Sequence, residues 1–390
     1  MLLKATNRPD FYLSPNLYIM VSQQAQTGNG RMISMDVLRV LSMFLIVTGH
    51  FLFYGVRNHP TLGTFHPESV SETCTYLILQ LIYVFTVTGV NCFVLISGYF
   101  LIEKTTFRSA LLKIWVETIF YSLLLSLIFS FCGGEKIPPT TWLDHLSPFP
   151  RREYWFITQY MGLALLAPFL AYLGKSLNQK QYLFLLGVLL LLFFKIPFGR
   201  SFTTGMSINW FILLFFVGGY FRKFALPDWL RTRTVLCLTV TAAGIYLFHL
   251  AENLTDITQP QGAFTLRYTG NNALTFLTSI CLFACFTEKK EICQAGQFIG
   301  KLAPYTLGIY LCHEHSAVRD FLWNRLLPEI CHHHLLLPGL FFTILVFLSC
   351  TGIDFLREQL FKRIGINRAI QKLGEKLPQP FGPKKEIRNQ

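Results

Sequence analysis

Residues 34–55, SMDVLRVLSMFLIVTGHFLFYG, form an apolar stretch that is long enough to cross a membrane, which takes about 20 helical residues. Three ionisable residues interrupt it: Asp36, Arg39 and His50. At about 100° per residue, Arg39 and His50 differ by only about 20° in direction and stand about 16 Å apart along the axis. An intramembrane charge is costly unless it faces a protein interior or a wet cavity, so this polar face predicts a buried site.

The composition extends the membrane prediction to the whole chain. Of the 390 residues, 52% are hydrophobic and only 14% are charged, against about 25% charged in a soluble domain. The ten cysteines include no C-x-x-C pair and lie mostly in apolar runs, which indicates neither a disulfide framework nor a metal site. The sequence therefore predicts an all-α, polytopic membrane protein without a bound metal.

About ten transmembrane helices are predicted, with short loops between them. The apolar segments lie near residues 35–55, 75–101, 109–131, 154–174, 181–198, 204–221, 233–251, 266–287, 302–319 and 335–356. With an even number of spans, most of the 34 lysine and arginine residues fall on the side of the two termini, which predicts that both are cytoplasmic.

This topology divides the chain into a polar leader (1–33), a transmembrane domain (34–358) and a basic cytoplasmic tail (359–390). The net charge of +13 is then an orientation signal and does not indicate a nucleic-acid partner. Membrane lipid is the expected partner of the tail, through anionic head groups.

Four motifs follow one another along the chain in a recognisable order. They are Arg39 and His50 with ten residues between them, residues 93–99 (FVLISGY), residues 155–157 (WFI) followed by Pro168, and residues 307–313 (LGIYLCH). In this order and spacing, the chain resembles the acyltransferase 3 family of integral membrane acyltransferases. One departure is Glu314, which follows His313 where the family often has proline.

The resemblance implies a membrane O-acyltransferase of the bacterial cytoplasmic (inner) membrane. Its donor would be cytoplasmic acyl-coenzyme A, in particular acetyl-coenzyme A, used as a co-substrate and not as a bound cofactor. Its acceptor would be a hydroxyl of an envelope polysaccharide or a lipid-linked glycan. The chain resembles the family members that consist of the membrane domain alone.

His50 is the leading catalytic candidate, because an imidazole titrates near neutral pH and can act as a base or as a nucleophile. Arg39, Asp36 and His313 complete the predicted catalytic set. Simpler interpretations remain open: Asp36 and Arg39 also fit an i,i+3 pair at the head-group boundary, and His50 fits a core histidine. Tyr310, His313 and Glu314 fit a polar relay on neighbouring faces of one helix.

The predicted donor site comprises Lys104, Arg108 and Lys113 at the cytoplasmic mouth, with Ser97 nearby. Arginine and lysine bind phosphates well, but these residues are equally explained by the positive-inside rule. Two further residues have alternatives as well. Glu117 fits either an intramembrane functional carboxylate or a partner of Lys113, and Trp155 fits an aromatic anchor at the membrane interface.

A glycan or lipid transporter, or a flippase without acyl-transfer chemistry, is the alternative function. Helices that carry intramembrane charges suit a transporter too, but the hydropathy pattern shows no inverted repeat between the two halves.

Overall fold

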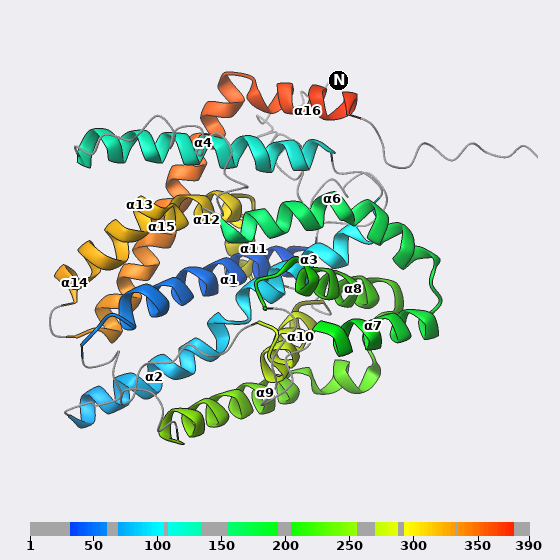
Figure 1. Cartoon of the computed structure of the whole chain (residues 1–390), viewed down its shortest axis with the longest axis horizontal. Helices are drawn as coiled ribbons and strands as arrows, with labels where there is room; N and C mark the ends of the chain where they lie inside the picture. The colour runs from blue at the N-terminus through cyan, green and yellow to red at the C-terminus, as the bar shows by residue number, and fades with distance from the viewer. Residues whose placement is uncertain are drawn as a thin grey trace, which may run out of the picture.

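The computed structural model describes residues 32–60, 69–104, 108–133, 154–193, 204–255, 270–287, 292–331 and 334–377. Within these ranges the chain forms helices and no strand, which confirms the all-α prediction. Most of the predicted leader, residues 1–31, and the end of the tail, residues 378–390, lie outside the described residues. Figure 1 shows α1 and α3 inside the bundle, α4 and α16 along one edge, and α9 along the opposite edge.

The chain order of the helices follows the predicted apolar segments. The elements are α1 (Ile33–His50), η2 (Phe51–Val56), α2 (Val70–Thr86), α3 (Gly89–Leu101), α4 (Arg108–Gly133), α6 (Trp155–Ser176), α7 (Gln179–Phe193), α8 (Ile208–Phe224), α9 (Asp228–Thr255), α10 (Ala273–Thr287), α11 (Gln294–Gly300), η3 (Ala303–Tyr305), α12 (Thr306–Glu314), α13 (Ser316–Arg319), η4 (Asp320–Leu326), α14 (Leu327–Ile330), α15 (Leu336–Arg363) and α16 (Ile366–Lys376).

Five helical stretches are long and apolar enough to cross a membrane. They are Ile33–Val56, Val70–Leu101, Arg108–Cys132, Trp155–Ser176 and Leu336–Arg363. Two shorter apolar helices, α7 and α10, have 15 residues each. The count of about ten spans and the cytoplasmic position of both termini therefore stay predictions.

Two predicted segments are broken where the chain makes special contacts. Segment 75–101 divides into α2 and α3, and α3 begins where Gly89 meets α1 so closely that a Cβ would lie 2.8 Å from the Ser42 carbonyl oxygen. Segment 302–319 divides at His315, whose extended backbone (φ −55°, ψ 132°) ends α12. The break places His313 and Glu314 in the last turn of α12.

The centre of the bundle depends on close backbone packing between α3 and α8. A Cβ at Gly98 would lie 2.3 Å from the Phe215 carbonyl oxygen, and one at Gly218 would lie 2.2 Å from the Leu95 carbonyl oxygen. Small residues allow membrane helices to approach this closely, so Gly98 and Gly218 have a packing role.

A buried ion cluster joins α4 to α15. Arg357 donates hydrogen bonds to Glu117 (2.8 Å), Asp354 (2.9 Å) and Glu358 (2.9 Å), and Asp354 also accepts one from the Tyr121 hydroxyl (2.8 Å). The Arg357 guanidinium and its three carboxylate partners are all buried. One guanidinium thus compensates several carboxylates that would otherwise be very costly inside the membrane.

The same cluster settles the position of Glu117 and of α12. The Lys113 ammonium lies 3.6 Å from Glu117, so Glu117 has the structural partner that its i−4 spacing predicts and a second one in Arg357. Gly308 of α12 lies directly against Asp354, and a Cβ there would overlap the carboxylate. The cluster therefore fixes α12 on α15.

We expect Arg357→Ala to destabilise the fold strongly, because it leaves three buried carboxylates without their shared cation. Removing one partner of a buried pair costs about 3–5 kcal/mol. Unfolding of the purified protein in mixed micelles should measure the loss, with Arg363→Ala, an exposed arginine of the same helix, as the matched control. Equal stability of the two variants would show that the cluster does not hold α4 and α15 together.

Candidate active site

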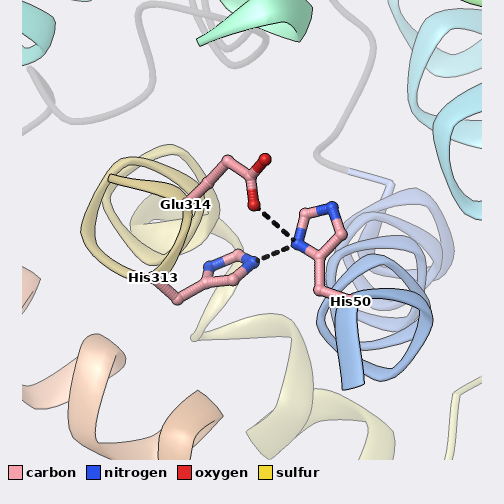
Figure 2. Close-up of side chains that lie close together, drawn as sticks. All are labelled: His50, His313 and Glu314. Atoms are coloured by element: carbon pink, nitrogen blue, oxygen red, sulfur yellow. Dashed lines mark hydrogen bonds and ion pairs between the residues drawn. The ribbon is translucent and has the colours of Figure 1, made fainter. Parts of the chain in front are cut away.

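The ends of α1 and α12 bring three ionisable side chains together (Figure 2). Nδ1 of His50, the last residue of α1, lies 2.9 Å from Nε2 of His313 and 3.1 Å from Oε2 of Glu314. His313 and Glu314 are buried, and His50 is partly exposed. The structure thus joins two histidines that the sequence predicted separately, and adds a carboxylate beside His50.

The hydrogen bonds around His313 fix which nitrogen of each ring carries a proton. Nδ1 of His313 lies 2.6 Å from the Ile309 carbonyl oxygen, which only accepts, so this nitrogen is the donor. With both rings neutral, Nε2 of His313 is then an acceptor, and His50 donates from Nδ1 to it; Glu314 Oε2 lies 3.1 Å from the same nitrogen but accepts no hydrogen bond. The lone pair of His50 therefore lies on Nε2, the nitrogen that points away from both partners in Figure 2.

Two neighbours bind the other oxygen of the Glu314 carboxyl group, Oε1. Arg319 Nη1 lies 3.1 Å from Oε1, and the Tyr54 hydroxyl donates to the same oxygen at 3.4 Å. The Arg319 guanidinium also lies 5.0 Å from the centre of the Tyr54 ring. Tyr54 belongs to η2, a π-helical turn that follows His50 directly, and such turns are frequent at functional sites.

A cavity of ≈ 350 Å³ lies beside His50. It is lined from α1, η2, α2, α3 and α6 and from the segments before α8 and α10. Four of its described lining residues are aromatic: Phe53, Tyr54, Tyr83 and Trp155. Trp155, for which an interfacial anchor was the favoured interpretation, therefore lines the same cavity as the candidate base.

The predicted cytoplasmic members of the catalytic set do not reach this group. Asp36 and Arg39 lie three turns earlier on α1, both buried, with 3.2 Å between Oδ1 and Nη1. Ser97 is also buried, and its hydroxyl lies 3.0 Å from that of Tyr160. These residues form a second polar region, on the N-terminal side of α1.

The predicted donor-site cations differ in how they are already bound. Arg108 donates to the Leu377 and Glu375 carbonyl oxygens at the end of α16, and Lys113 belongs to the ion cluster through Glu117. Lys104, just after α3, has no side-chain partner among the described residues, and partial burial lowers the pKa of its ammonium. A phosphate beside it would raise that pKa again.

His50, His313 and Glu314 also form a group whose donor atoms, one from each residue, lie within 4.8 Å of one another. Donor atoms around a tetrahedral zinc ion at about 2.0–2.1 Å stand about 3.3 Å apart. The 2.9 Å between the two imidazole nitrogens is shorter and fits an N–H···N hydrogen bond. The distance between the two imidazoles therefore favours a directly hydrogen-bonded pair.

Sequence analysis missed the roles of Tyr54 and Arg319 and did not rank Glu314 among the site residues. The available signal was Glu314 itself, a carboxylate in an apolar helix at a position where the related motif often has proline. Tyr54 offered a weaker signal, since it lies one helical turn after His50.

Comparison with known protein families agrees with these residues. The family model for acyltransferase 3, described as an acyltransferase domain, matches residues 32–357. The chain therefore belongs to the acyltransferase 3 family, and it is an integral membrane acyltransferase. Neither the curated proteins nor the solved structures searched gave a significant match.

Because the two imidazole nitrogens lie at hydrogen-bond distance, closer than two ligands of one zinc ion, we expect acyl transfer to survive a metal chelator. The measurement is turnover of the purified protein before and after dialysis against EDTA, together with the zinc content of the sample. Loss of activity that returns on adding zinc would show instead that the group is a metal centre.

Proposed function

We propose that the protein transfers an acetyl or similar small acyl group from cytoplasmic acyl-coenzyme A to a hydroxyl of an envelope polysaccharide or lipid-linked glycan. The observation that carries the proposal is the arrangement of His50: its Nδ1–H is donated to His313, Glu314 lies 3.1 Å from the same nitrogen, and the side chain lines an aromatic cavity. An imidazole so arranged offers the lone pair of Nε2 to whatever enters that cavity.

The proposed step is general-base catalysis by His50. The acceptor hydroxyl gives its proton to Nε2, its oxygen forms a bond to the thioester carbonyl carbon, and the carbon–sulfur bond breaks. His50 then returns the proton to the departing thiolate of coenzyme A. Glu314 contributes by stabilising the imidazolium and by holding the ring, the task that a buried carboxylate performs in serine hydrolases.

Transfer of the acyl group through His50 itself is the related possibility, because the same lone pair is also a nucleophile. The two routes differ in one intermediate, an acyl-imidazole on His50. Incubation with labelled acyl-coenzyme A in the absence of acceptor separates them, since only the nucleophilic route leaves label on the protein.

On the donor side, we propose that the phosphates of coenzyme A bind at the cytoplasmic mouth, where Lys104 is the least engaged of the predicted cations. Arg39 and Asp36 are buried on the same helix as His50, nearer its N-terminus, and we assign them to the path of the acyl group. This arrangement agrees with both termini on the cytoplasmic side and with a site in the bacterial inner membrane.

The central test is acyl transfer by purified protein in lipid nanodiscs to glycans extracted from bacterial envelopes, followed by mass spectrometry. We expect His50→Ala to lower kcat by about 10²–10⁴-fold, the usual contribution of a general base. Glu314→Gln should fall between His50→Ala and the wild type, because it keeps the size of the side chain and loses the charge.

His59→Ala is the matched control. His59 follows η2, beyond the end of α1 where His50 lies, but it is not among the residues that line the cavity beside His50. If His50→Ala keeps wild-type turnover and His313→Ala loses it, the general base is His313 of α12. Turnover unaffected in both would exclude the proposed mechanism.

We expect Lys104→Ala to raise the KM for acyl-coenzyme A about ten-fold and to leave kcat unchanged. A charge-assisted contact to a phosphate contributes roughly 1.5–3 kcal/mol. Lys180→Ala, an exposed lysine at the start of α7, is the control for general charge effects. An unchanged KM in Lys104→Ala would leave this lysine as an ordinary positive-inside residue.

A further inference from the structure

The described residues that line the cavity beside His50 carry few charged groups for a site that binds a polar substrate. Among its described lining residues, none carries a carboxylate, an ammonium or a guanidinium group. His50 is the only one of them that can become a cation, and in the hydrogen-bonded arrangement with His313 it is neutral. A charged group that entered would lose its hydration and find no opposite charge in these walls, which is a large cost.

The side-chain amide of Asn91, a polar group in the cavity lining, already makes hydrogen bonds within the protein. Asn91 donates from Nδ2 to the Gly270 carbonyl oxygen (2.8 Å) and to the Ser279 hydroxyl (3.1 Å), and accepts from the Trp210 indole at 3.0 Å. Gly205 packs against Gly270 so closely that a Cβ would lie 2.6 Å from its nitrogen. These lining residues therefore shape the cavity and do not supply donors to a ligand.

Aromatic surface is what the cavity offers in place of charge. Three helical elements contribute aromatic rings to its lining: Trp155 belongs to α6, Phe53 and Tyr54 to η2, and Tyr83 to α2. Tyr54 is the exception in one respect, because its hydroxyl is directed to Glu314. Aromatic side chains bind the apolar faces of a ring while leaving its edge groups free to meet a base.

We propose that the acceptor group bound beside His50 is an uncharged glycosyl ring, held against Trp155, and that sugars with a carboxylate are excluded. This inference rests on the proposed function, which it narrows to neutral sugars such as hexoses and N-acetylhexosamines. The Trp155 indole provides the surface that contacts the sugar ring. Sugars with a carboxylate bind less well than neutral sugars because the described lining residues include no cation to pair with the carboxylate.

The test uses two probes that differ only at C6, methyl glucoside and methyl glucuronide. Their binding to the protein in nanodiscs is measured by saturation-transfer NMR, which does not require acyl transfer. We expect the glucoside to bind at least about ten-fold more tightly than the glucuronide, since a carboxylate in these walls has no partner.

Variants then assign the effect to residues. Trp155→Ala should weaken glucoside binding about ten-fold or more through lost apolar contact, while Trp155→Phe retains most of it. Trp115→Ala, an exposed tryptophan of α4 outside the cavity, is the matched control. Met206→Lys places a cation in the wall and should shift the preference toward the glucuronide.

Equal or tighter binding of the glucuronide by the wild type, or no effect of Trp155→Ala, overturns the inference, and so does failure of both probes to bind. The proposed function has a separate outcome. Glucoside binding without acyl transfer to any glycan would contradict the proposed function and still support a neutral-sugar site. Acyl transfer to uronic acid residues would support the proposed function and contradict this inference.

Discussion

The contact between the ends of α1 and α12 is the interaction on which the site depends. Nδ1 of His50 lies 2.9 Å from His313 and 3.1 Å from Glu314, and the hydrogen bond to His313 fixes the tautomer of His50 and the nitrogen that stays available. The contact requires a buried carboxylate, and a buried carboxylate requires compensation. Arg319 and Tyr54 provide it, so the local backbone from His50 to Val56 and from His315 to Arg319 serves the same centre.

The position of α12 depends in turn on a second charged group at the other end of that helix. Asp354 lies against Gly308 and is bound to Arg357, so the start of α12 is held on α15 by the ion cluster. Both groups balance buried carboxylates with an arginine. They differ in whether a ligand can reach them, because the ion cluster is enclosed while His50 borders a cavity. Only a buried ionic group that a ligand can reach is a candidate active site.

The two polar regions of α1 lie toward opposite ends of that helix. Arg39 and Asp36 lie at the N-terminal end and His50 at the other, about 16 Å away along the helix. The proposed reaction needs this separation, because a soluble phosphate-bearing donor and an envelope glycan meet the membrane from opposite sides. One helix that carries both regions keeps their spacing fixed.

The sequence by itself determined the all-helical class, the importance of α1, the family and the candidacy of His50 and His313. These follow from local properties: hydrophobic length, helical periodicity and motif order. It did not determine that Glu314 completes the group, that Trp155 lines the cavity, or that Arg108 and Lys113 have protein partners. Those facts belong to tertiary structure, because His50 and His313 are 263 residues apart in the chain and helical periodicity relates only neighbours within one helix.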